Sequence, residues 1–148
     1  PKVAIAPLIM VWFGLGDLSK VVLASTIVFF SVMINTMDGL RIRPEYYDLA
    51  RVYKANDWQI MLRIRLRNAL PNIFTGLRIG TTLAVIGVTV AEFVGSQDGL
   101  GHLMVLYQAY LKIPQMFAAI VVLSIFGYIF YELLKLIEKN LLPWYREE

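Results

Sequence analysis

Four apolar runs constrain this chain more than any other feature of its sequence. A helix needs roughly 20 apolar residues to cross the hydrocarbon core of a bilayer. The runs at 18–37, 69–94 and 116–137 reach that length, and the mean hydropathy of the whole chain is +0.62. Only 17% of the residues are charged, against about 25% in soluble domains. The sequence therefore predicts an all-α, polytopic transmembrane bundle, with residues 1–148 as a single transmembrane domain.

The first run, at 3–16, is shorter than the others, contains Pro7 and ends in a glycine-rich turn. It is interpreted as a spanning helix whose beginning is missing or as a re-entrant segment. No charged region with a cleavage site precedes it, so the chain is expected to be the C-terminal part of a longer protein that lacks its N-terminal span or spans. Lys20, near the start of the second run, is expected to snorkel to the lipid headgroups.

The distribution of basic residues predicts an orientation, because cytoplasmic loops are enriched in lysine and arginine. Seven of the 14 basic residues lie in the loop at 38–68, whereas the loop at 95–115 carries only Lys112. We therefore expect the 38–68 loop and the C-terminal tail to be cytoplasmic and the 95–115 loop to be external. Two long runs separate the 38–68 loop from the tail, and one run separates each of them from the 95–115 loop, so this alternation is self-consistent.

The 38–68 loop shows helical periodicity although it is charged. Four side chains fall at i, i+3, i+4 and i+7 and define one face of a short helix: Tyr46, Leu49, Ala50 and Tyr53. Asn56 is expected to cap a second helix, with Gln59 as its capping-box partner. The loop is thus predicted to be helix, turn, helix, with the second helix leading into the third run. Such an insert either lies on anionic headgroups or docks on a cytoplasmic partner.

Polar residues inside the runs have structural and functional interpretations. Gly76 and Gly80 form a GxxxG pattern, which suits close packing within the chain but also a translocation path or a dimer interface. Arg78 is expected to snorkel to the cytoplasmic headgroups. Glu92 is either an interfacial acid bonded to loop backbone or another helix, or a gate or substrate contact. Asn35, like the neighbouring Thr36, either hydrogen-bonds across helices or lines the pore.

Little in the chain suggests metal or catalytic chemistry. There is no cysteine and a single histidine, His102, which is interpreted as a solvated loop residue. The acids are scattered, so no catalytic cluster of acid, base and nucleophile is predicted. Aromatic residues near the ends of the runs fit interfacial belts: Trp12, Phe13, Tyr107, Tyr110, Trp144 and Tyr145.

At the 38–68 loop the sequence resembles a known family, the membrane-spanning permease subunits of binding-protein-dependent ATP-binding-cassette importers of the nitrate/sulfonate/taurine type. Their loop pattern is Glu-Ala-Ala, three residues, Gly, nine residues, then Ile-x-Leu-Pro. Here residues 48–50 (DLA) occupy the first slot, Lys54 the glycine slot, and 64–66 (IRL) the last. Three further stretches agree with the family: PLIMVWFGLGDLSK (7–20), NALPNIFTGLRIG (68–80) and AEFVGSQDGLG (91–101).

The loop departs from the family pattern at four positions. Asp48 and Leu49 replace glutamate and alanine, Lys54 replaces the glycine, and Arg67 replaces the proline. In the family the glycine ends the first helix in a left-handed turn. Lysine adopts that conformation at a cost of roughly 1 kcal/mol. The fold of the loop is therefore expected to survive, with an altered fit to its partner.

The resemblance implies an importer permease of a bacterial or archaeal cell (inner) membrane, which is not itself an enzyme. It implies that the first helix of the loop is a coupling helix that seats in a cytoplasmic ATPase subunit; ATP would be bound there and not by this chain, whose sequence has no GxxxxGK[ST] motif. The residues assigned to this coupling are Tyr46, Asp48, Leu49, Ala50, Arg51, Tyr53 and Lys54. Those assigned to the translocation path are Asn35, Gly80 and Glu92.

The other partners that the resemblance implies are an extracytoplasmic solute-binding protein, a second copy of the chain and membrane lipid, with no nucleic acid. The solute is expected to be a nitrate-, sulfonate- or taurine-like anion or a vitamin-precursor pyrimidine. Two alternatives stay open: half of an ion-gradient-driven secondary transporter, and a membrane scaffold that does not transport. The first lacks support because the middles of the third and fourth runs carry no ionisable residue.

Overall fold

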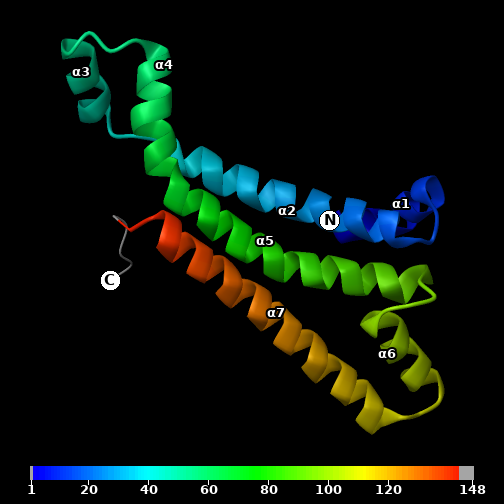
Figure 1. Cartoon of the computed structure of the whole chain (residues 1–148). Helices are drawn as coiled ribbons and strands as arrows, with labels where there is room; N and C mark the ends of the chain where they lie inside the picture. The colour runs from blue at the N-terminus through cyan, green and yellow to red at the C-terminus, as the bar shows by residue number, and fades with distance from the viewer. Residues whose placement is uncertain (1, 144–148) are drawn as a thin grey trace.

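The computed structural model describes residues 2–143, and these residues form helices and no strand. The all-α prediction is therefore confirmed. Figure 1 shows long helices running between two ends of the molecule, with short helices at each end. In chain order the elements are η1 (Lys2–Ile5), α1 (Ala6–Phe13), α2 (Asp17–Gly39), α3 (Pro44–Val52), α4 (Asp57–Ile60), η2 (Met61–Arg65), α5 (Leu66–Gly95), α6 (Leu100–Ala109) and α7 (Ile113–Leu141).

Three of the described helical segments are long and apolar enough to cross a membrane, and they coincide with the three long runs of the sequence. They are Asp17–Gly39, Asp57–Gly95 and Ile113–Leu141. The first run forms only η1 and the eight residues of α1, which ends at Gly14 with φ of 83°. Both interpretations of this run, a spanning helix whose beginning is missing and a re-entrant segment, stay predictions.

Helices α2 and α5 form the main contact of the fold. Gly76 lies where α5 crosses α2, and a Cβ at this position would be 2.9 Å from the Cα of Val32. The absence of a side chain lets the two backbones approach closely. Ser31 donates a buried hydrogen bond of 3.2 Å to the carbonyl oxygen of Gly76 across this contact. The GxxxG pattern thus serves packing within the chain, the first of its predicted roles.

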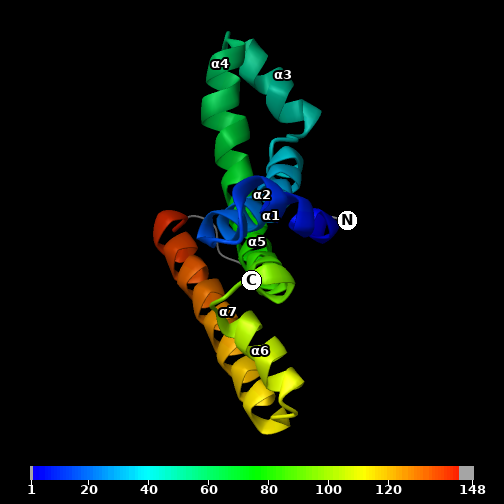
Figure 2. The ribbon, with the colours of Figure 1, turned by 90° about the vertical axis from the view of Figure 1, so that its right-hand side faces the viewer.

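The two ends of the molecule differ in what they carry. One, which we call the loop end, carries α3 and α4 together with the C-terminal part of α7; the other, the α6 end, carries α1 and α6 (Figure 1). A cluster of buried apolar residues joins α1, α2 and α5 at the α6 end: Ala6, Ile9, Met10, Leu23, Ile27 and Ala91. Seen from the side, α3 and α4 project beyond the bundle (Figure 2).

The C-terminal span stands apart from the other two. It diverges from α5 toward the α6 end, where α6 lies beside it (Figure 1). Only 6% of its most apolar 18-residue window is buried, against 33% for the α5 span. Exposed side chains such as Phe117, Ile125 and Leu133 occur along its length. Lipid or further helices must cover such a surface.

Candidate functional site

The first helix of the loop, α3, begins at residues that favour a helix start and ends just before a left-handed turn. Pro44 occupies its first position, where the missing N–H costs nothing, and Glu45 lies in the first turn. The chain then turns at Lys54, whose φ is 56°. Its N–H donates to the carbonyl of Arg51 over 2.9 Å. The predicted left-handed turn at the glycine slot is thus confirmed with a lysine in it.

The second helix of the loop is fixed by its cap. The Asn56 side chain accepts a hydrogen bond of 2.8 Å from the backbone of Gln59, and the Gln59 side chain accepts one of 3.0 Å from the backbone of Asn56. This is the predicted capping box. From Asp57 the helix continues through the π-helical η2 into α5, a single segment of 39 residues that ends at Gly95. At 1.5 Å per residue it is about 58 Å long.

This long helix extends well beyond α2, which has 23 residues and is thus about 35 Å long. The hydrocarbon core is about 30 Å thick. About 28 Å of this segment, nearly half of its length, therefore exceeds the hydrocarbon core when α5 spans it. Because α3 is attached to this projecting part, the loop is carried on a stiff arm that is continuous with a transmembrane helix.

The residues predicted to form the docking face of α3 lie together. All four of them line one groove of about 570 Å³ between α3 and the arm. The other residues that line this groove are Ala55, Gln59, Arg63 and Ile64. Ala50 is buried at the bottom of α3, whereas Tyr46, Leu49 and Tyr53 are more than half exposed. Val52, on α3 as well, is 77% exposed. A nine-residue helix with so much exposed apolar surface is typical of a binding segment.

A polar network joins α3 to the beginning of α4. Arg51 donates hydrogen bonds of 2.7 and 3.2 Å to the hydroxyl of Tyr47 and forms an ion pair with Asp57. The hydrogen bond with Tyr47, followed by the charge of Asp57, raises the pKa of Arg51, which stays cationic. Asp48 and Lys54 are exposed on the same loop. The sequence analysis missed Tyr47, although its spacing of four from Arg51 on one helix was the available signal.

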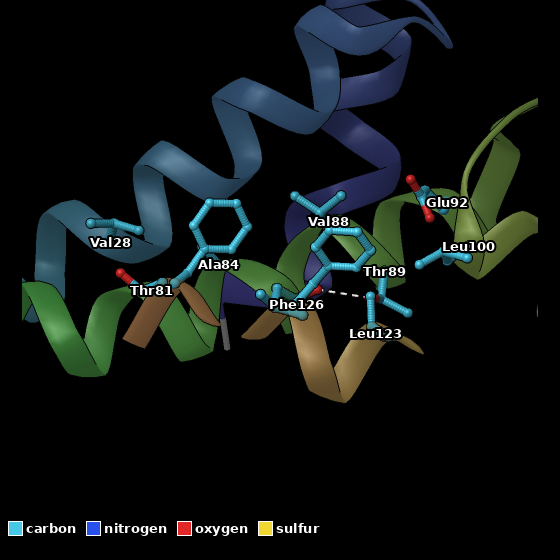
Figure 3. Close-up of a pocket in the computed structure, with 11 residues that line it drawn as sticks. Val28, Thr81, Ala84, Val88, Thr89, Glu92, Leu100, Leu123 and Phe126 are labelled. Carbon is cyan, nitrogen blue, oxygen red and sulfur yellow. Dashed lines mark hydrogen bonds between the residues drawn. The ribbon is translucent and has the colours of Figure 1, made fainter. Parts of the chain in front are cut away.

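A second hollow lies inside the membrane-spanning part. It has a volume of about 440 Å³ and is bounded by α2, α5, α6 and α7, as Figure 3 shows. Its surface is mainly aliphatic and aromatic, including Phe126 and Phe130. The polar residues that line it are Thr81, Thr89 and Glu92. A largely apolar cavity with a few polar groups is the usual form of a small-molecule site.

Glu92 stands where three helices meet at the α6 end. Its Oε2 accepts a hydrogen bond of 2.7 Å from the backbone N–H of Gly101, in the first turn of α6. Its Oε1 lies 3.8 Å from the Nζ of Lys20 on α2. Glu92 is 9% exposed. The interpretation as an interfacial acid bonded to other backbone is therefore confirmed; contact with a solute stays a prediction.

Two cations predicted to snorkel are paired instead. Lys20 forms ion pairs with Asp17 and Glu92, and its side chain is 13% exposed. Arg78 is 7% exposed, and its Nε lies 3.4 Å from Oε2 of Glu138 on α7. The snorkelling predictions are wrong for both residues. A buried cation needs an anionic or polar partner in protein or lipid, and here the neighbouring helices supply it.

The remaining predicted path residues lie in the α2–α5 contact. The Asn35 side chain donates a hydrogen bond of 2.8 Å to the carbonyl oxygen of Ser31 within its own helix. The Thr36 hydroxyl likewise donates to the carbonyl oxygen of Val32. Hydrogen bonds between the two helices come instead from Ser31 and from Asn68, whose side chain donates to the carbonyl oxygen of Gly39. A Cβ at Gly80 would lie 3.0 Å from Val28. A role of Asn35 and Gly80 in translocation stays a prediction.

The segment 95–115 was expected to be an external loop, but it contains the ten-residue helix α6. His102 is therefore a half-buried helical residue, and its interpretation as a solvated loop residue is wrong. Among residues 2–143, no group of three His, Asp or Glu side chains is arranged to hold a metal ion. The predicted belt residues Trp12 and Tyr110 are exposed, while Trp144 and Tyr145, like Arg146 of the C-terminal tail, lie outside the described residues.

Comparison with known proteins decides the family. Residues 1–143 match the family described as the binding-protein-dependent transport system inner membrane component. The chain belongs to this family. The resemblance inferred from its motifs is thereby confirmed, and with three long apolar helices the chain is a multi-pass membrane protein of a transport family. No solved structure gives a significant match.

Similar proteins are named as transport permeases and not as enzymes. The chain is 39% identical to the riboflavin transport system permease protein RibX of Chloroflexus aurantiacus, over 97% of this chain and 54% of the relative. It is 36% identical to the formylaminopyrimidine transport permease ThiX of Halalkalibacterium halodurans, over 100% and 60%. It is 33% identical to a putative aliphatic sulfonates permease, SsuC, of Bacillus subtilis, over 97% and 52%. The chain thus spans about half the length of these relatives.

Proposed function

We propose that this chain belongs to the membrane-spanning permease subunit of an ATP-binding-cassette importer. In this proposal the subunit receives a small solute from an extracytoplasmic binding protein and passes it across the membrane. A separate ATPase subunit binds ATP, so the chain itself needs no cofactor. The observation that carries the proposal is α3, a short helix with exposed apolar side chains on a stiff arm continuous with a span.

The coupling role is assigned to Tyr46, Asp48, Leu49, Ala50, Arg51, Tyr53 and Lys54. Tyr46, Leu49 and Tyr53 supply apolar and aromatic contact area, which is typical of the centre of a protein interface. The charged residues of the loop supply a polar rim. When two ATPase subunits close on ATP, they would displace α3, and the arm would carry that movement into α5. This is rigid-body switching between two packed states.

The proposed orientation places the loop at 38–68 and the C-terminus in the cytoplasm of a bacterial or archaeal cell. Two observations support it. Half of the basic residues lie in the loop, which favours the cytoplasmic side. The C-terminal part of α7 also lies at the loop end, as expected when two spans, α5 and α7, follow the loop (Figure 1). The binding protein would then approach the α6 end.

A second copy of the chain and lipid are the proposed covers of the exposed apolar surface. Exposed apolar side chains cover most of the circumference of α7, including Phe117, Phe126 and Phe130, and leave out the strip that contains Ala119 and Glu138. A helix that is apolar over most of its surface suits a bilayer or the core of a larger assembly. Pairing of two copies would close a path between them, to which Asn35, Gly80 and Glu92 are assigned as proposals.

The cavity between α5 and α7 favours an uncharged aromatic solute over a small anion. None of the eleven residues that line it is a lysine or an arginine, and two are phenylalanines. An anion taken from water into such a surface would lose its hydration without gaining a cationic partner. Uncharged rings of the kind carried by ThiX and RibX fit these walls better than the sulfonates carried by SsuC. Uptake of labelled formylaminopyrimidine with little uptake of taurine would support this assignment; the reverse preference would overturn it.

The decisive experiment is co-purification of the full-length protein from its native membranes in a mild detergent, with partners identified by mass spectrometry. An ATPase subunit recovered at a ratio near one to one is the expected result. Recovery of the protein without any ATPase, together with uptake that follows an imposed ion gradient, would replace the proposal by a secondary transporter. Recovery without either would leave a membrane scaffold.

A further inference from the structure

The attachment of α3 to the rest of the chain raises a mechanical question. α3 has no extensive backbone packing against another helix. It is joined to α2 through residues 40–43 and to α4 through residues 53–56. A helix held only by two short linkers would swing when a partner pulled it, and the pull would be lost. Movement reaches α5 only if side chains fix α3 to the arm.

One aromatic side chain provides such a linkage. The ring of Tyr47 on α3 lies near two guanidinium groups: the Cζ of Arg51 is 5.2 Å from the ring centroid, and the Cζ of Arg65 is 5.8 Å from it. Both distances are within the range of cation–π attraction. Arg51 also donates to the Tyr47 hydroxyl and pairs with Asp57. The ring is thus connected to α3, α4 and η2 at once.

The burial of Arg65 indicates that its contact with Tyr47 is more than a surface contact. It is half-buried, and its Nε is a buried nitrogen without a hydrogen-bond partner in the described part of the chain. An unsatisfied buried donor is unfavourable, so packing at this position must hold the guanidinium in place. In the described residues, the guanidinium of Arg65 packs against the face of the Tyr47 ring.

The position of Arg65 on the arm is also unusual. It is the last residue of η2, a π-helical turn of five residues within an otherwise α-helical segment. π-helical turns are rare and often occur at functional sites, because the wider turn interrupts the regular hydrogen bonding. A force on Arg65 therefore acts where the arm passes from this turn into α5.

We propose that Tyr47, linked to Arg51 and Arg65, is the positioning residue that transmits movement of α3 to the transmembrane helix α5. The inference rests on the proposed function, since it presumes that α3 is moved by an ATPase. Tyr47 itself is half-buried between the helices, so its role is to connect and not to bind the partner. Losing the ring should uncouple ATP hydrolysis from transport while leaving the ATPase bound.

The test uses the full-length protein reconstituted in liposomes with its ATPase and binding protein. Solute transported per ATP hydrolysed and ATPase association are measured for Tyr47→Ala and Tyr47→Phe. The Phe variant keeps the ring and loses only the hydroxyl. The matched control is Tyr110→Ala, since Tyr110 lies 5.9 Å from the ammonium of Lys112 at the opposite end of the molecule. Arg65→Gln is the second variant, which removes the cation and leaves the ring.

For Tyr47→Ala we expect a fall of about tenfold in solute per ATP, with association within about twofold of the unmodified protein. Tyr47→Phe should retain most of the ratio, and Tyr110→Ala should leave it unchanged. An unchanged ratio in Tyr47→Ala, or loss of ATPase association in that variant alone, would overturn the inference. If Tyr47→Ala does not accumulate in membranes, the same outcomes are decided on Arg65→Gln. Failure of the unmodified protein to bind any ATPase would instead refute the proposed function.

Discussion

The two ends of the molecule differ in how much of their surface is buried within the chain. At the α6 end, α1, α2 and α5 share a buried apolar cluster, and the carboxylate of Glu92 accepts a hydrogen bond from a backbone N–H of α6. At the loop end, α3 stands on a projecting arm and leaves Leu49, Val52 and Tyr53 largely exposed. One end is held by burial, and the other by a few side-chain linkages.

The difference indicates how stability and function are divided along the chain. Residues at the α6 end are buried and hydrogen-bonded by one another, so substitutions there should lower the free energy of unfolding. Residues of α3 make fewer contacts within the chain, so substitutions there should weaken association with a partner and change the stability little. Four variants with matched controls test this division, in order of their expected effect on the free energy of unfolding.

Gly99→Ala should be the most destabilising change, by about 4 kcal/mol. Gly99 has φ of 111°, and an added Cβ would overlap the carboxylate of Glu92. Two glycines at the same end separate the causes: Gly14 (φ 83°) has open space around its Cβ position, and Gly16 has open space without a positive φ. In thermal unfolding of the detergent-solubilised protein, the loss of stability should rank Gly99→Ala, Gly14→Ala, Gly16→Ala. Equal losses of stability at Gly99 and Gly14 would show that the overlap with Glu92 contributes nothing to the effect of Gly99→Ala.

Glu92→Ala should destabilise the protein by about 3 kcal/mol, because it leaves the N–H of Gly101 and the ammonium of Lys20 with fewer partners in a buried place. Glu92→Gln keeps an acceptor for Gly101 and should cost about 1 kcal/mol. Glu45→Ala, which removes an exposed carboxylate from the first turn of α3, is the loop-end control and should cost at most about 0.5 kcal/mol. The same unfolding measurement serves all three. A loss at Glu45 as large as at Glu92 would contradict the division between the ends.

Lys54→Gly should stabilise the protein by about 1 kcal/mol, because glycine adopts a positive φ without the Cβ penalty. Leu111, at the opposite end of the molecule, has the same φ of 56° and is 81% exposed, so Leu111→Gly is its matched control. Both variants should raise the unfolding temperature. Lys54→Gly should also preserve or strengthen association with the ATPase. Weaker association in Lys54→Gly alone would identify Lys54 as a specific contact.

Local signals in the sequence predicted much of this architecture. The three long runs specified the spans, because only a helix satisfies its own backbone in lipid. The capping box at Asn56 and Gln59 and the left-handed turn at Lys54 were likewise readable, since both depend on residues adjacent in sequence. Periodicity also grouped the residues of α3 that line one groove.

Contacts between segments far apart in the chain could not be predicted from the sequence in this way. The pairing of Arg78 with Glu138 joins residues 60 positions apart, and nothing local to either residue indicates it. The same is true of Lys20 with Glu92 and of Tyr47 with Arg65. A single sequence predicts that a buried charge needs a partner, but the packing of the helices decides which one. The helix α6 was missed because the short segment between two turns shows weak periodicity.

Tyr53→Asp should have the smallest effect on stability and the largest on function. Tyr53 is 79% exposed, so the substitution removes little packing and should change the free energy of unfolding by less than about 0.5 kcal/mol. In an interface the same change would place an unpaired carboxylate against apolar surface, which costs several kcal/mol of binding. ATPase association, measured by co-purification, should therefore be lost, whereas Tyr110→Asp, at a 67% exposed tyrosine on the opposite end, should leave it intact. If Tyr53→Asp instead unfolds the protein, α3 is part of the packed fold and the contrast between the two ends fails; if association persists, the docking surface lies elsewhere on the loop.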